Sequence, residues 1–188
     1  MKQNEIKKNL TETSKSIYHD YGKFAIEFEQ LTLSIKICIF SLLKLQGLED
    51  FKYLRILLHD QTASPLHQKL RSLLALHYEE NPKRLKAVEK LFTHSKKIIE
   101  KRNDIIHGSF FVSSEEEEGN LFKDKAANTG VKQIDEIYDS EKFATYTTKV
   151  ILTRQNFDIL NSYLHEDDTV FDHFFNDEKL KELDIEKD

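Results

Sequence analysis

The chain has 188 residues, of which 39% are hydrophobic and 32% are charged, with 5 glycines and 2 prolines. This length suits one domain with a substantial core, and so few chain-breaking residues favour long helices over a sheet. A net charge of −5 argues against a general binder of duplex DNA, and the single cysteine, Cys38, excludes an intramolecular disulfide.

Hydrophobic periodicity predicts a series of helices after a polar lead at residues 1–13. The first helix ends at Gly47, and its apolar residues alternate spacings of three and four, which is typical of packed antiparallel helices. Its second half carries further apolar residues, including Leu33 and Ile37, so we expect burial on several sides. The predicted helices lie at residues 17–46, 49–59, 64–78, 82–107 and 140–164.

The helix at residues 82–107 has clear signals at both ends. Asn81-Pro82 is typical of a cap followed by the first helical position, and a second such pair, Ser64-Pro65, opens the preceding helix. Gly108 is typical of a left-handed residue that ends a helix. One face of the helix is an apolar stripe, formed by Leu85, Val88, Leu91, Phe92, Ile98, Ile99, Ile105 and Ile106.

Arg102 falls near the middle of this apolar stripe, while Lys97, Lys101 and Asp104 fall on the opposite, polar side. A guanidinium cannot lose its charge, so Arg102 must meet a carboxylate, a phosphate or a subunit interface. From Pro82 to Arg102 there are eight Lys or Arg against two Glu. This local positive charge is compatible with a phosphate backbone, although a solvated helix face accounts for the lysines taken alone.

After the Arg102 helix the periodicity changes. Residues 109–138 predict a small hairpin with an acidic turn at 115–118 and a loop, while 131–138 is compatible with either strand or helix. An acidic segment, 165–188, follows the last long helix. The predicted fold class is all-α, a single domain over residues 1–188 built of long antiparallel helices, with a small β-hairpin inserted after the Arg102 helix.

Arg102 and His107, separated by four residues, resemble the arginine and histidine motif of HEPN-domain proteins. Asn103 follows the arginine, Gly108 follows the histidine, and the motif ends its helix, as in that family. The resemblance is strongest over residues 82–108. It implies a HEPN-like helical bundle that cleaves RNA without a metal or other cofactor, at a site composed from both motifs of a homodimer. It also implies a toxin–antitoxin or defence context, with an antitoxin or defence-system protein as a possible partner.

On an ideal helix Arg102 and His107 lie about 140° apart, so they converge poorly within one chain. A two-fold axis close to the helix end would gather two arginines and two histidines in one cleft. There His107 would transfer protons, Arg102 would stabilise charge on phosphorus, and Asn103 would hold the histidine ring or a phosphate oxygen. The remaining candidates, for substrate binding, are Lys101, Asp104 and Lys97.

A second pair, Arg71 and His77, satisfies the same motif with five residues between its members. On its helix Arg71 falls on the polar side, and Ser72 stands where the family prefers Asn, Asp or His. We therefore expect Arg71 in solvent and His77 in the core. A further departure is Ser109, because members paired with a nucleotidyltransferase antitoxin often carry tyrosine there, so modification at this position is not supported.

Two alternative interpretations stay open. The chain is a catalytically silent HEPN-like module for binding or assembly, or it is an unrelated helical bundle. In the second case Arg102 pairs with Glu27 or Glu29 in a structural salt bridge, which would set the register of the helices.

No metal site and no membrane segment are predicted. The group of His165, Asp168, Asp172 and His173 has metal-ligand types, but it belongs to a general acidic run and is interpreted as solvated surface. The N-terminus has no apolar region typical of a signal peptide, and the longest apolar runs are too short to span a bilayer. We therefore expect a cytoplasmic protein.

Overall fold

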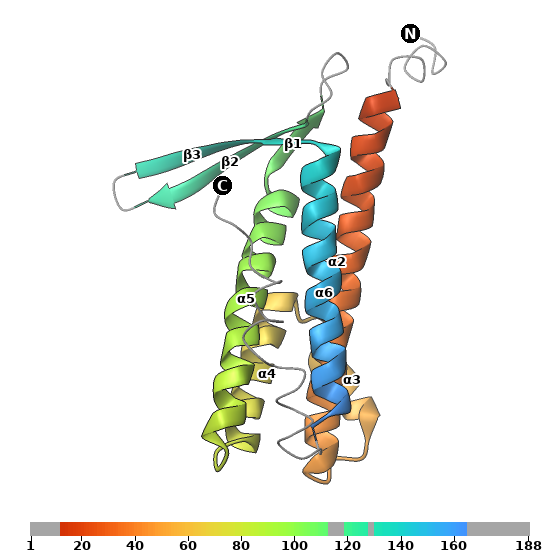
Figure 1. The fold of residues 1–188 in the computed structure, drawn as a ribbon, viewed down its shortest axis with the longest axis vertical. Coiled ribbons are helices and arrows are strands. Elements are labelled where there is room, and N and C mark those ends of the chain that lie inside the picture. Colours follow the sequence, from red (N-terminus) through yellow and green to blue (C-terminus); the bar gives the residue numbers. More distant parts are fainter. Residues whose placement is uncertain (1–11, 113–118, 128–129, 165–188) are drawn as a thin grey trace. The chain divides into compact units, whose positions relative to one another are not determined.

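The computed structural model describes residues 12–112, 119–127 and 130–164, with side chains over 15–109 and 136–164. Helix predominates in these residues, as the sequence predicts (Figure 1). In chain order the elements are α2 (Glu12–Leu45), α3 (Phe51–Leu58), α4 (Ala63–His77), α5 (Pro82–His107), β1 (Ser109–Val112), β2 (Gly119–Ala127), β3 (Gly130–Tyr138) and α6 (Ser140–Ser162).

The start of α5 is marked by a residue that caps the first turn of the helix. Asn81 precedes α5, and its Oδ1 accepts a hydrogen bond from the backbone N–H of Arg84 at 3.1 Å. This confirms the predicted start of α5 at Pro82. The start of α4 differs from the prediction, because Thr62 is the extended residue before the helix and Ala63 is already helical.

The two predicted terminal glycines differ from each other. Gly47 follows α2 with a φ of 85°, a conformation that costs little without a Cβ. The N–H of Leu48 donates to the carbonyl of Leu43 at 3.1 Å, which satisfies one of the last carbonyls of the helix. Gly108, in contrast, continues the helical pattern by donating to the carbonyl of Asp104 at 3.0 Å. The left-handed conformation is therefore found at Gly47 and not at Gly108, where the chain enters β1 directly.

The segment between α5 and α6 forms an antiparallel sheet of order β1-β2-β3, drawn as arrows in Figure 1. β2 and β3 pair over nine residues each, from Gly119 opposite Tyr138 to Ala127 opposite Gly130. The sequence predicts a small hairpin and a loop here, and it leaves 131–138 open between strand and helix. The structure places this segment in β3, and β2 pairs with β1 along one edge and with β3 along the other. Three predicted features lie outside the described residues: most of the polar lead, the acidic turn at 115–118 and the acidic segment 165–188.

The chain divides into two compact units, to both of which α2, α5 and α6 contribute residues. In the first unit the ring of Phe143 lies at the centre of the aromatic core. Its centroid is 6.0 Å from that of Tyr21, 6.2 Å from that of Phe24 and 5.2 Å from that of Tyr138. The units are Met1–Ile26 with Glu100–Thr148, and Glu27–Ile99 with Lys149–Asp188.

The second unit has its own core. The rings of Phe92 and Phe157 meet edge to face at 5.6 Å, and the thiol of Cys38 donates to the carbonyl of Phe157 at 3.2 Å. Burial raises the pKa of Cys38 well above its usual range, so the thiol stays neutral. The expectation that the second half of α2 is buried on several sides is wrong for Leu33 and Ile37, which are exposed.

Candidate functional site

The last two turns of α5, in the first unit, carry the predicted arginine and histidine. Arg102 and Asn103 are half-buried, and Nη1 of Arg102 is 3.4 Å from Oδ1 of Asn103, to which it donates a hydrogen bond. His107 is the last residue of the helix and is exposed. Arg102 is therefore only partly covered, although Ile98, Ile99 and Ile105, which flank it on the helix wheel, are buried.

Lys101, which the sequence places on the polar face, binds Glu136 near the end of β3. Its Nζ donates to the two carboxylate oxygens at 2.6 and 2.8 Å, and Nζ of Lys142 on α6 lies 2.9 Å from Oε1. The side chains of Lys101 and Glu136 are only 22% and 23% exposed. The Lys101 ammonium also lies over the rings of Tyr138 and Tyr146, at 5.5 and 5.1 Å. The polar-face placement of Lys101 is thus corrected, because this face of α5 meets β3 and α6.

Glu136 is the negative centre of what we call the Glu136 cluster: Lys101, Glu136, Tyr138, Lys142 and Tyr146. Burial alone would raise the pKa of the Glu136 carboxyl, but the hydrogen bonds and charges of Lys101 and Lys142 lower it overall. The hydroxyl of Tyr138 donates to Oε2 at 3.1 Å. Burial and the adjacent carboxylate raise the pKa of Tyr138, which keeps the phenol neutral. Lys101 and Lys142 thus bring two ammonium groups to the carboxylate of Glu136, and the carboxylate of Asp104 is also close enough to act on Tyr138.

The other predicted substrate contacts, Asp104 and Lys97, differ in their placement. Asp104 is half-buried in the first unit, and its charge is one of the weaker causes that raise the pKa of Tyr138. Lys97 is exposed on α5 and belongs to the second unit. Five of the six predicted site residues therefore lie on the last two turns of α5, from Lys101 to His107, as their positions in the sequence require.

The second arginine–histidine pair lies in a different environment. Arg71 is 57% exposed, and its Nε donates to Oε1 of Glu89 at 2.8 Å. The prediction that Arg71 lies in solvent is confirmed. His77 is half-buried, with Nε2 at 3.2 Å from the carbonyl oxygen of Leu164, so it belongs partly to the core as expected.

The alternative to a catalytic role for Arg102 is a structural salt bridge with Glu27 or Glu29. Oε2 of Glu27 lies 3.8 Å from Nη2 of Arg154 on α6, and Glu29 is exposed. This places a cation of the second unit beside Glu27. The pairing of Arg102 with either carboxylate stays a prediction.

Sequence reasoning missed two buried polar groupings. One is the Glu136 cluster, which depends on how β3 meets α5 and α6. The other is the hydrogen bond of 2.7 Å between Nε2 of His67 and Oγ of Ser95, both buried in the second unit. Ser95 follows Leu91 by four residues and Phe92 by three, so it falls on the apolar stripe of α5. This position could have predicted a buried serine side chain.

Metal sites, membrane segments and known relatives complete the description. Within the described residues, no group of three or more His, Cys, Asp or Glu side chains could hold a metal ion. The group from His165 to His173 lies outside that part of the chain. Among the helices described, none has both the length and the apolar character needed to cross a bilayer. No protein-family model, curated protein or solved structure significantly matches the chain.

Proposed function

We propose that this chain is a metal-independent endoribonuclease with a HEPN-like fold, acting in the cytoplasm as a homodimer. The observation that carries the proposal is the end of α5, where half-buried Arg102 and Asn103 precede the exposed terminal His107. Histidine exchanges protons near neutral pH, and a guanidinium restrained by its surroundings is suited to a phosphate.

The proposed reaction is an internal transesterification of RNA. The 2′-hydroxyl attacks the adjacent phosphorus and gives its proton to one His107. The bond from phosphorus to the 5′-oxygen breaks, and that oxygen receives a proton from the partner's His107. Arg102 stabilises the charge on the phosphoryl oxygens, while Asn103 restrains Arg102 through their hydrogen bond. The products are a 2′,3′-cyclic phosphate and a 5′-hydroxyl end.

The first test replaces the proposed catalytic side chains. Arg102→Ala and His107→Ala should each lower the rate of RNA cleavage by at least about 100-fold, since each removes a charge or a proton carrier. Both side chains are half-buried or exposed, so far-ultraviolet circular dichroism should show an unchanged helix content. Arg71→Ala is the matched control, because Arg71 belongs to the other pair and binds Glu89 on the surface. Equal losses for Arg71→Ala and Arg102→Ala would contradict the assignment.

The second test examines the chemistry. Cleavage should persist in EDTA, and mass spectrometry of the fragments should find 2′,3′-cyclic phosphate or its opened form with 5′-hydroxyl ends. A 2′-deoxy nucleotide at the scissile position should block cleavage but leave binding intact, because it removes only the nucleophile. Metal-dependent cleavage that leaves 5′-phosphates would exclude this mechanism. RNA binding without cleavage between pH 6 and 8 would support the silent module instead.

The biological setting belongs to the same proposal. Dimeric helical nucleases of the family that the motif resembles act as toxins or in antiphage defence. We extend this to the present chain, with an antitoxin or a defence-system protein as the partner that limits its activity.

A further inference from the structure

An apolar groove of about 640 Å³ lies in the second unit, between α2, α3 and α4. Its walls include Leu43 of α2, Leu54 and Leu57 of α3, and Pro65 and Leu73 of α4. Leu57 is 64% exposed although it lies in this wall. Apolar side chains that line an open groove and remain in contact with water are typical of a docking surface.

A second, smaller hollow of about 180 Å³ is also lined by Leu73, together with Leu42, His77 and the exposed Leu76. The two hollows thus follow α4 from Pro65 to Leu76, a distance of roughly 16 Å along a helix axis, or about three turns. An amphipathic helix of about eleven residues has an apolar stripe of this length.

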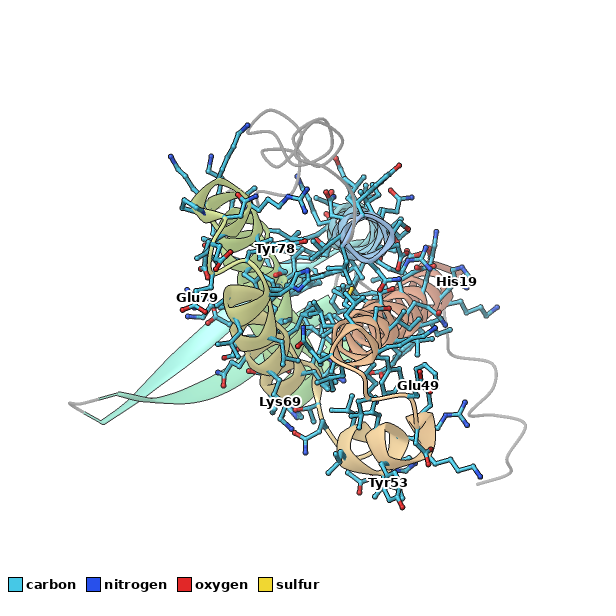
Figure 2. All side chains as sticks on the ribbon, turned by 90° about the horizontal axis from the view of Figure 1, so that it is seen from below. His19, Glu49, Tyr53, Lys69, Tyr78 and Glu79 are labelled. Atoms are coloured by element: carbon cyan, nitrogen blue, oxygen red, sulfur yellow. The ribbon has the colours of Figure 1, made fainter. Side chains whose placement is uncertain are left out.

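The charges around the groove select among its conceivable occupants. Lys69 lines the groove, where its Nζ donates to Oε1 of Gln61 at 3.2 Å, and no carboxylate lines either hollow. The adjoining helix α3 carries Lys52 and Arg55, and acidic residues flank it at Glu49, Asp50 and Asp60. Lys69 is therefore the charge that the lining of the groove itself offers to an occupant, and it favours acidic side chains there. Tyr53 on α3 and Lys69 on α4 are both labelled in Figure 2.

We propose that the groove between α2, α3 and α4 binds an amphipathic helix of a partner protein, with leucine-like residues on one face and acidic residues beside them. The apolar face would fill the walls around Leu57 and Leu73, and an acidic residue would meet Lys69. This proposal does not depend on the nuclease activity, because every residue it uses belongs to the second unit.

The test uses a synthetic peptide of about 18 residues, long enough to form a helix. It carries leucine at helical spacing, glutamate elsewhere and one tryptophan. The protein has no tryptophan, so the emission of the peptide alone reports binding to the full chain. A matched peptide has lysine in place of every glutamate. We expect saturable binding of the glutamate peptide and at least about tenfold weaker binding of the lysine peptide.

Variants locate the binding to the groove. Leu57→Glu should weaken binding of the glutamate peptide by at least about tenfold, since it places a charge in the apolar wall. Ile56→Glu is the matched control, because Ile56 is the next residue on α3 and 75% exposed but does not line the groove. Lys69→Glu should remove the preference for the acidic peptide. Leu57 is exposed, so its variant should fold normally, which thermal unfolding can verify.

Several outcomes would overturn the proposal. These are absence of saturable binding, equal binding of both peptides, or equal effects of the two α3 variants. Loss of a dimer on Leu57→Glu in light scattering would identify a second copy as the occupant. Binding of dodecanoate but of neither peptide would identify an acyl chain instead.

Discussion

His67 shows how a single buried histidine makes stability depend on pH. Its ring lies 4.5 Å from that of Phe92, and Ser95 binds Nε2. Burial lowers the pKa of His67 from 6.5 to about 4, so between these values the unfolded chain binds a proton that the folded chain does not. The contribution of neutral His67 to the free energy of unfolding is fully present above pH 6.5 and is lost as the pH falls toward 4. At pH 5 the free energy of unfolding should be lower by about 2 kcal/mol for this reason.

Urea unfolding at pH 7 and pH 5 measures this contribution. His67→Gln keeps a hydrogen-bonding side chain but cannot titrate. Between pH 7 and pH 5 the free energy of unfolding of this variant should therefore fall by about 2 kcal/mol less than that of the wild type. His19→Gln is the control, because His19 is exposed on α2 (Figure 2) and should leave the pH dependence unchanged. Identical pH dependence in the wild type and His67→Gln would show that the histidine is not held neutral by burial.

At the scale of elements, the Glu136 cluster joins the end of α5 to β3 and to the beginning of α6. Glu136→Gln keeps the shape of the side chain but leaves the ammonium groups of Lys101 and Lys142 without their carboxylate in a largely buried setting. We expect this change to cost roughly 1–3 kcal/mol of unfolding free energy. Glu89→Gln is the matched comparison and should cost less than about 1 kcal/mol, because its partner Arg71 is exposed.

Denaturant unfolding of the two glutamine variants distinguishes these cases. The contribution of Glu136 should also fall at acidic pH, because its lowered pKa means that the unfolded carboxyl takes up a proton before the folded one does. A loss for Glu89→Gln as large as that for Glu136→Gln would mean that the cluster is no stronger than a surface pair.

At the scale of the whole molecule, the composite site requires two chains. Light scattering at micromolar concentration should give about twice the chain mass of 22.2 kDa. An excess of His107→Ala chains mixed with wild-type chains should lower cleavage by the wild type, because hybrid dimers lose one of the two histidines that the reaction uses. A strictly monomeric protein, or wild-type activity unchanged by the excess of variant chains, would contradict the composite site.

The helices themselves could be predicted from the sequence. The alternating apolar spacing located α2, α5 and α6, and Asn81-Pro82 marked the start of α5. These predictions succeed because capping and amphipathic periodicity involve neighbours a few residues apart. The exposed Arg71 was predicted for the same reason, since its position on the helix wheel faces away from the core.

The environment of the candidate site depended on contacts between residues far apart in the chain. The sequence alone determined the helix that carries Arg102, Asn103 and His107, with the histidine at its end. Only the tertiary structure decided that Lys101 binds Glu136, 35 residues away, and that Arg102 is half-buried. Helical periodicity says which residues share a face, but the partner of that face is set by packing between distant segments, for which local spacing carries no information.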